Sequence, residues 1–384
     1  MSRNVTNDSR PSTPGLDSRL LSLVSSLAAA LLALPAVASA QAASGGTFYM
    51  GTYANKILVI DEATLAVRDS IAMSIGIPSV WTLSANRQRL YVRNPRADRV
   101  EIVDLATRKA TGTFTLNSPG TTVQIWGMNV DPKERFAILL VKWYTKRADR
   151  YEVTGPRMLR YDLEKRAVTD TIPWPRGEER EFAQIIFSPA GDLMYFFTAD
   201  DILVYDAVTL KQVDRWDYAT SFFEDGMGRI NPGFGADLYE EPGFFTGLLR
   251  VSDPVNRRTL MGVGRVDLAR RTVDYYMLGP SAPVSFRLAP GKHRAYGIRN
   301  EVGQYEFWTF DLDDRRVVGK TEFPGRPRMG LTIGTNGDRL YIHTAGNSID
   351  VHDVNGFRKL RTVTFDFDMT VITLIPARPP GPGH

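Results

Sequence analysis

A short motif that recurs along the chain constrains the fold more than any other feature. It is clearest at residues 202–216, where an apolar strand ends at Asp206, a short turn follows, and a second strand starts at Lys211. Aspartate suits this place because its carboxylate accepts hydrogen bonds from the backbone amides of the turn. Each copy therefore predicts a β-hairpin. The seven aspartates are Asp61, Asp104, Asp162, Asp206, Asp267, Asp311 and Asp353.

The spacing of the seven copies predicts the architecture. Successive aspartates lie 43, 58, 44, 61, 44 and 42 residues apart. A period in the forties with four short strands per unit is typical of a β-propeller. The two long intervals predict insertions in the third and fifth units. Further strands are expected at residues 80–84, 89–93, 185–188, 193–197, 284–288 and 331–333.

The two ends of the repeat region complement each other. Residues 47–52 read as a second strand without an inner partner, and residues 371–375 read as an inner strand without a second. Together they complete one blade and close the ring, which removes exposed sheet edges. We therefore predict an all-β chain, a seven-bladed β-propeller over residues 41–376 whose terminal strands share one blade. Residues 377–384 are expected to form a disordered tail.

The first 40 residues have the pattern of a secretory signal peptide. Arg3, Arg10 and Arg19 precede an apolar run that ends in the small-residue sequence Ala-Ser-Ala at Ala40. The alternative is a retained anchor, but the run is rich in alanine and interrupted by Pro35. We expect cleavage after Ala40 and a periplasmic or secreted protein. No later segment is apolar enough to span a bilayer.

Composition narrows the function classes. With 47 basic and 43 acidic residues the net charge is +4, too small an excess to indicate nucleic-acid binding. The absence of cysteine excludes disulfides, thiolate metal sites and cysteine nucleophiles. No two of the four histidines have metal-ligand spacing, so neither a metal nor a cofactor is expected. A Ser–His–Asp triad stays open, although no G-x-S-x-G motif is present.

The stretch Leu90-Tyr91-Val92-Arg93-Asn94 resembles the YVTN type of propeller repeat, with arginine in place of threonine. Beyond the repeat, the chain is similar to the propeller subunits of periplasmic quinoprotein amine dehydrogenases. The resemblance implies a propeller without a redox centre of its own, packed against subunits that carry a quinone and haem.

Basic residues gather where the repeat places the mouth of the ring. Second strands end there and inner strands begin there, so their termini should share one rim. Converging arginines can hold a carboxylate or an acidic surface. The alternative is an ordinary solvated rim, because acidic residues are interspersed. The candidate ligand- or partner-binding residues are Arg93, Lys142, Arg287, Arg299, Arg328 and His343.

Both insertions are candidate interaction sites. Residues 218–248 of the fifth unit are rich in aromatic residues and are expected to cover the propeller face or to present anchors to a partner. Filling of the enlarged blade is the alternative. In the third unit, residues 143–156 are expected to form a protruding basic loop. The candidate partner-facing aromatics are Phe222, Phe223, Phe244 and Phe245.

These observations favour an exported, non-catalytic binding or scaffold protein, and a subunit of a periplasmic redox complex is one such role. Its partner would be a protein or a small anionic ligand. No catalytic residue is assigned. The alternative is a hydrolase or lyase whose site at the central mouth combines Arg287, His343 and a carboxylate.

Overall fold

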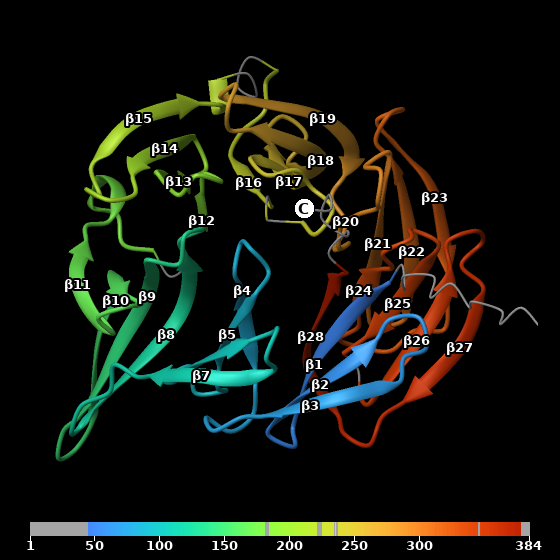
Figure 1. Cartoon of the computed structure of the whole chain (residues 1–384). Helices are drawn as coiled ribbons and strands as arrows, with labels where there is room; N and C mark the ends of the chain where they lie inside the picture. The colour runs from blue at the N-terminus through green and yellow to red at the C-terminus, as the bar shows by residue number, and fades with distance from the viewer. Residues whose placement is uncertain are drawn as a thin grey trace, which may run out of the picture. The chain divides into compact units, whose positions relative to one another are not determined.

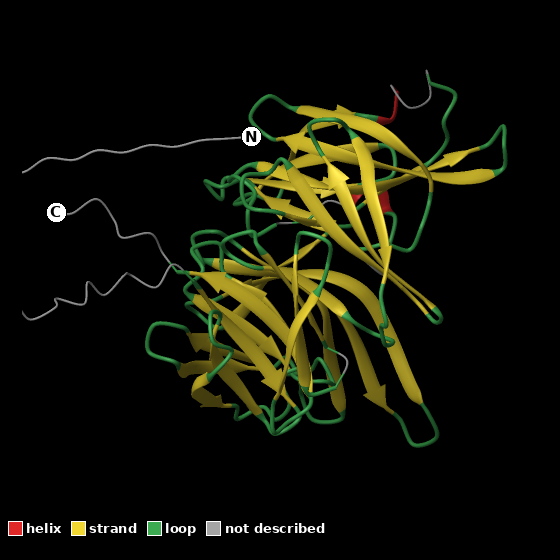
Figure 2. Cartoon of the chain, turned by 90° about the vertical axis from the view of Figure 1, so that its right-hand side faces the viewer, coloured by secondary structure: helices red, strands yellow, loops and turns green. Residues whose placement is uncertain are grey.

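The computed structural model describes residues 45–180, 184–220, 225–233, 235, 237–344 and 346–377. The chain divides into two compact units, Met1–Ala42 and Ala43–His384, and every described residue belongs to the second. Strands and the loops that join them make up almost all of this unit (Figure 2). A short 3-10 helix, η1 (Pro175–Gly177), precedes the fourth sheet. The predicted signal peptide lies outside the described residues.

Seven four-stranded antiparallel sheets, here called blades 1 to 7, follow one another along the chain (Figure 1). From inner to outer edge, blade 1 contains β28 (Met369–Pro376), β1 (Gly46–Thr52), β2 (Lys56–Asp61) and β3 (Val67–Ala72); blade 2 contains β4 (Val80–Leu83), β5 (Arg89–Arg93), β6 (Val100–Asp104) and β7 (Lys109–Phe114); blade 3 contains β8 (Thr121–Val130), β9 (Phe136–Lys146), β10 (Tyr151–Asp162) and β11 (Ala167–Ile172).

The remaining blades keep the same order, and the chain is a seven-bladed β-propeller, as predicted. Blade 4 contains β12 (Gln184–Phe187), β13 (Leu193–Phe197), β14 (Asp201–Asp206) and β15 (Gln212–Asp217); blade 5 contains β16 (Ile230–Pro232), β17 (Phe244–Asp253), β18 (Arg258–Asp267) and β19 (Thr272–Pro280); blade 6 contains β20 (Arg287–Leu288), β21 (Arg294–Glu301), β22 (Gln304–Asp311) and β23 (Arg316–Glu322); blade 7 contains β24 (Gly330–Ile333), β25 (Arg339–His343), β26 (Ser348–Asp353) and β27 (Lys359–Thr364).

The repeated aspartates build the outer hairpins. Asp206 accepts hydrogen bonds from the amides of Val208 at 3.0 Å and Thr209 at 2.6 Å. In every blade the residue four positions after the aspartate has a positive φ, as Leu210 does at 59°. In blade 4 the pairing of the two strands then contains a β-bulge at Tyr205. A type I turn closed by one left-handed residue gives this hairpin. In six of the seven hairpins the aspartate carboxylate accepts a hydrogen bond from the backbone N–H of the residue three positions later. Asp353 is the exception.

The core is divided among the blade interfaces, because successive strand residues point to opposite faces of a sheet. Leu90 and Val92 of β5 pack toward blade 1, whereas Tyr91 between them packs toward blade 3. Seven buried clusters of the described residues fill the seven interfaces, including the interface between blades 7 and 1. This arrangement requires a closed ring.

The predicted closure by both termini is confirmed. In Figure 1 the red strand β28 lies beside the blue strand β1, and the register pairs Thr47 with Ile375. Across the seam, the carboxylate of Glu62 accepts hydrogen bonds from the backbone N–H of Thr335 at 2.8 Å and from its hydroxyl at 2.6 Å. Glu62 also accepts the amide of Gly46. Backbone pairing and a buried carboxylate thus join the first and last blades.

Two sequence-based expectations need correction. The loop expected at residues 143–156 is wrong, since β9 and β10 run on as a paired hairpin with a short turn after Lys146. The inner strand expected at 284–288 is reduced to Arg287 and Leu288. There the Ser285 hydroxyl accepts a hydrogen bond from the backbone N–H of Ile298 at 3.0 Å. A side-chain oxygen thus takes the place of a backbone carbonyl of the inner strand.

Candidate binding face

The blades have two ends with different contents. The end where second strands finish and inner strands start is called the mouth face, and Arg93 and His343 lie there. The other end carries the turns between first and second strands and the aspartate hairpins. It is called the turn face, and Arg87 and Asp206 lie there. Every mouth residue predicted from the sequence belongs to blades 2, 3, 6 or 7.

The turn face is bridged by part of the fifth-blade insertion. Residues 237–241 leave blade 5 and make hydrogen bonds to three other blades. Asp237 Oδ2 accepts the amide of Leu288 at 3.2 Å, and the Tyr239 hydroxyl donates to the carbonyl of Ile333 at 2.8 Å. The Arg87 guanidinium donates to the carbonyl of Leu238 at 2.8 Å.

This bridging segment is desolvated. Burial raises the pKa of the Asp237 carboxyl. Hydrogen bonds from the amides of Tyr239 and Leu288 and the charge of Arg287 lower it by less than burial raises it. Burial likewise raises the pKa of the Tyr239 hydroxyl. Leu238 packs against the buried cluster between blades 7 and 1. The insertion therefore joins blades 2, 5, 6 and 7 on the turn face.

The predicted aromatic residues of the insertion contribute little exposed surface where they are described. Phe245 is buried between blades 4 and 5. Phe244 is partly buried beneath the guanidinium of Arg265, 4.1 Å from its ring centroid. Phe222 and Phe223 lie outside the described residues. The partner-facing role of the insertion stays a prediction.

Four basic side chains lie in blades 6 and 7. Three of them lie toward the mouth face, whereas Arg287 lies deeper in the ring, because it pairs with Tyr296 near the turn-face end of β21. Arg287 and Arg326 both lower the pKa of His343 through their charges, and the hydroxyl of Thr344 donates to the carbonyl of Arg328. Arg326 pairs with Asp350 at 2.7 Å. Arg287 and Arg328 are exposed, and neither has an ion-pair partner among the described residues.

His343 is the buried member of this group. Burial, followed by the charges of Arg287 and Arg326, lowers the pKa of its imidazole from 6.5 to about 3. Its Nε2 lies 2.9 Å from the hydroxyl of Thr332, and its buried Nδ1 has no hydrogen-bond partner. The side chain packs against Gly330, where an added Cβ would lie 2.6 Å from Cε1. His343 is therefore a neutral packing residue at neutral pH.

Arg299 differs from its neighbours because its charge is balanced within blade 6. Its guanidinium donates to Glu301 at 2.7 Å and lies 3.9 Å from Glu306. Its backbone pairs with Val284 in an isolated bridge. We place Arg299 on the mouth face as an ion-paired residue.

Arg93 and Lys142 form a second group, at blades 2 and 3. The partly buried guanidinium of Arg93 donates to the carbonyls of Ile125 at 2.6 Å and Trp126 at 2.8 Å, and burial lowers its pKa. These carbonyls lie at a bulge of β8 that turns the Trp126 side chain outward, where it is 57% exposed. Lys142 Nζ lies 5.9 Å from the Trp126 ring centroid. The sequence analysis missed Trp126, because a bulge has no clear local signal.

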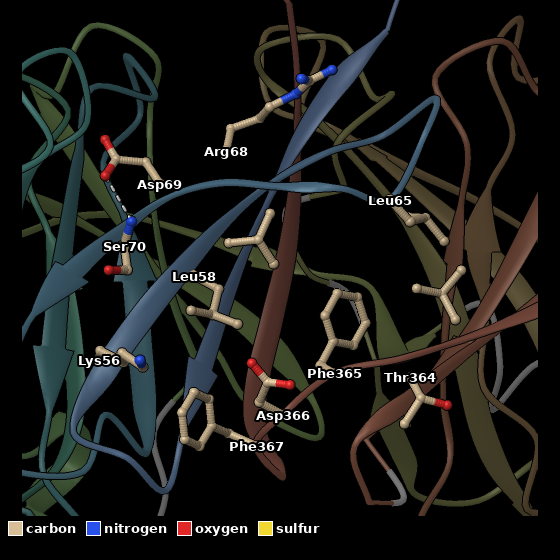
Figure 3. A pocket seen from close by; sticks show the side chains of 12 residues that line it. Lys56, Leu58, Leu65, Arg68, Asp69, Ser70, Thr364, Phe365, Asp366 and Phe367 are labelled. Atoms are coloured by element: carbon tan, nitrogen blue, oxygen red, sulfur yellow. Dashed lines mark hydrogen bonds between the residues drawn. The ribbon is translucent and has the colours of Figure 1, made fainter.

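One cavity lies away from both groups, at the seam between blades 1 and 7. Its volume is about 530 Å³, and Figure 3 shows Leu58, Leu65 and Phe365 facing into it beside Lys56 and Arg68. Lys56 Nζ lies 4.1 Å from the centroid of Phe367. The cavity is an open groove along outer strands, and no predicted site residue lines it.

A second cavity, of about 220 Å³, lies between blades 5 and 6. Its basic residues are matched by acids, as Arg265 is by Glu240 at 3.3 Å and Arg315 by Asp274 at 3.1 Å. Burial raises the pKa of Tyr276 to about 12, and its hydroxyl has no hydrogen-bond partner. This cavity also contains none of the predicted mouth residues.

Over the described ranges, no three His, Asp or Glu side chains are grouped so that they could hold a metal ion. Within the same ranges, no helix is long and apolar enough to cross a membrane.

Comparisons with known proteins agree with the fold. No protein-family model matches the sequence, and no curated protein matches it. Among solved structures, a dihydro-heme d1 dehydrogenase, NirN, is 10% identical over 86% of this chain and 75% of its own, with a TM-score of 0.50. AztD from Citrobacter koseri is 12% identical over 86% and 98%, with a TM-score of 0.50. A functionally unknown protein from Desulfotomaculum acetoxidans is 11% identical over 87% and 100%, with a TM-score of 0.51. At such low identity the likeness defines the fold alone.

Proposed function

We propose that this chain is an exported propeller that binds another protein or a small anionic ligand with its mouth face. One observation carries the proposal. Arg287 and Arg328 are exposed and form no ion pair with a described residue; the charge of Arg287 acts on the buried Asp237 only at longer range. The neighbouring Arg326 and His343 add no negative charge. Several guanidinium groups on one surface attract a carboxylate more strongly than a lone surface pair does.

The turn face supports this choice of surface. Residues 237–241 already engage blades 2, 6 and 7 there, so that face is occupied by the protein's own chain. Export is proposed from the leader pattern that ends at Ala40. We also propose a YVTN-type repeat and a place in a periplasmic redox complex. The similar fold of the dihydro-heme d1 dehydrogenase supports that place by analogy.

Binding has more support than catalysis at this site. A general base is most effective when its pKa lies near the working pH. The imidazole of His343 has a pKa of about 3 and packs against Gly330 and Thr332. The alternative enzyme therefore lacks its expected base.

The test compares two variants of equal charge in a pull-down from periplasmic extract of the source cells. Arg287→Ala/Arg328→Ala removes the two exposed candidate arginines of blades 6 and 7, and Arg270→Ala/Arg294→Ala removes two exposed arginines from the turn face. We expect the first variant to lose partners that wild type and the second retain. The loss should match the effect of raised salt, which screens exposed charges beyond about 8–10 Å. Identical retention by both variants would contradict the proposal.

A further inference from the structure

Blade 3 continues beyond the ordinary end of a blade on the mouth face. β8, β9 and β10 run on together to a hairpin tip at the lower left of Figure 1. The first residues of β8 pair with the end of β9, from Thr121 opposite Thr145. The start of β10 pairs on the other side of β9, from Tyr151 opposite Lys146. This three-stranded part, residues 121–124, 142–146 and 151–157, is called the blade-3 extension.

The two edges of the extension differ. On the inner edge, the amide of Val123 donates to the side chain of Asn117 at 2.7 Å, and Thr121 exchanges two backbone bonds with Ser118. On the outer edge, β11 pairs with β10 only from Met158 onward. Residues 151–154 of β10 therefore have no strand beside them in the described chain.

The hydrogen-bond alternation identifies which residues face this open edge. Lys146 donates its amide to the carbonyl of Gly120, on the side away from β10. Antiparallel residues alternate between bonding one neighbour and the other. Thr145 and Trp143 consequently bond Glu152 and Thr154. The backbone N–H and C=O groups of Tyr151 and Val153 point outward, and their side chains are 65% and 55% exposed.

The charge of the blade-3 extension indicates which kind of segment would bind at its open edge. Residues 142–157 contain five basic and two acidic side chains. Both acidic side chains form ion pairs with nearby arginines, Glu152 with Arg147 and Asp149 with Arg150. Lys146 lies opposite Tyr151 and so shares its face of the sheet. An incoming strand beside β10 would meet two apolar side chains next to the positive charge of Lys146.

We propose that the open edge of β10 binds an extended acidic segment of a partner protein, which adds as a fourth strand to the blade-3 extension. Main-chain bonds to Tyr151 and Val153 would provide the affinity, and contacts with their side chains and with Lys146 would provide the specificity. The inference rests on the proposed function in that it names how a partner of the mouth face is held. It uses no residue of blades 6 or 7.

The test is amide hydrogen exchange on the full chain, with a blocked octapeptide of alternating glutamate and valine as the probe. A lysine–valine peptide of the same length is the control. Without peptide, the amides of Tyr151 and Val153 should exchange fast and those of Glu152 and Thr154 slowly. Saturating acidic peptide should slow exchange at Tyr151 and Val153 by about tenfold or more.

A matched pair of variants separates strand addition from simple charge attraction. Val153→Pro removes an outward N–H that the sheet does not use, and Val153→Thr keeps that N–H with a β-branched side chain. Protection at Tyr151 should vanish in the proline variant and persist in the threonine variant, with both folded by thermal unfolding. Equal protection in both would overturn the proposal.

Two other outcomes would also overturn it. Protection that rises with protein concentration in the absence of peptide would assign the edge to a second copy of this chain. No protection by the acidic peptide, while the pull-down still depends on Arg287 and Arg328, would reject the strand-addition site and leave the proposed function standing.

Discussion

The turn face and the mouth face contain similar residue types and use them differently. On the turn face, charged groups are satisfied within the protein, as Glu62 is by Thr335 and Gly46. On the mouth face, Arg328 forms no ion pair with a described residue, and Trp126 is turned outward. The turn face thus contributes to stability, and the mouth face is the one that we propose for binding.

The largest effect is expected where both faces depend on one strand. A chain that ends at Asp368 lacks β28, which pairs with β1 from Gly46 to Thr52. Its loss exposes the edge of β1 and opens the cluster between blades 7 and 1. We expect loss of cooperative unfolding for the whole ring, measured by circular dichroism during heating. An unchanged melting temperature would show that the ring does not need closure.

The next largest effect is expected at the turn-face seam. Glu62→Ala leaves the amides of Thr335 and Gly46 and the Thr335 hydroxyl without their acceptor in a buried site. Buried donors left unpaired cost about 1–3 kcal/mol each where water cannot replace the partner. We expect a loss of about 3 kcal/mol in the free energy of unfolding, measured in urea. Glu241→Ala, an exposed carboxylate on the same face, is the control.

The two faces should also respond to acid in different pH ranges. His343 on the mouth face has a pKa of about 3 when folded and about 6.5 when unfolded. As the pH falls, the imidazole is therefore protonated in the unfolded state before it is protonated in the folded state. The free energy of unfolding consequently decreases as the pH drops from about 6.5 to about 3. Turn-face aspartates such as Asp206 have a lowered pKa, so their contribution is lost only below about 4.

Replacing the histidine isolates its share of this pH dependence. His343→Gln should remove up to about 1.4 kcal/mol per pH unit from the slope of unfolding free energy between pH 6 and 4. His293→Gln, which replaces an exposed histidine, serves as the comparison. Urea titrations at several pH values give the slope, and an unaltered slope in the His343 variant would mean that the imidazole is protonated in the fold.

A smaller effect is expected from a single hairpin. Asp206→Ala loses two turn hydrogen bonds and should lower the unfolding free energy by about 1 kcal/mol. Asp353→Ala is the matched comparison, because its Oδ1 is buried without a partner and its hairpin lacks the corresponding amide bond. Its removal should cost less. Equal losses in urea denaturation would mean that the turn bonds are not what the aspartate contributes.

The smallest effect is expected for the mouth-face arginines. Arg287→Ala/Arg328→Ala should change the unfolding free energy by less than about 0.5 kcal/mol, because exposed side chains that form no ion pair contribute little to the fold. Calorimetric melting checks this. A larger loss would mean that these arginines stabilise the fold as Glu62 does, and the two faces would then not differ in this respect.

The sequence predicted the blades well because each hairpin is specified locally. The Asp-turn pattern around Asp206 predicts both flanking strands, and the complementary ends near Thr47 and Ile375 predict the closure. The site was harder to predict. The repeat places Arg93 and Arg328 on one face, but the distance between them depends on which blades carry them. They fall into separate groups at blades 2 and 3 and at blades 6 and 7.

Other features depend on contacts between distant blades and have no local signal. The path of residues 237–241 is fixed by partners such as Arg87 and Ile333, which lie about 100 positions or more away in the sequence. The extension of β9 and β10 mixes basic, aromatic and small polar residues without a clear period, a composition that also suits an exposed loop. Pairing of β9 on both sides, as at Thr145, decides between the two.

The shared first blade also fixes where the polypeptide enters and leaves the ring. Gly46 begins a second strand and Pro376 ends an inner strand, and the two residues are paired. By the topology of a blade, both positions lie at the turn-face end. A tag, a surface tether or a fused reporter joined next to either residue would therefore leave from the end opposite Arg328 and Trp126. Attachment directly before Gly46 or after Pro376 is thus suited to immobilising this protein for binding measurements.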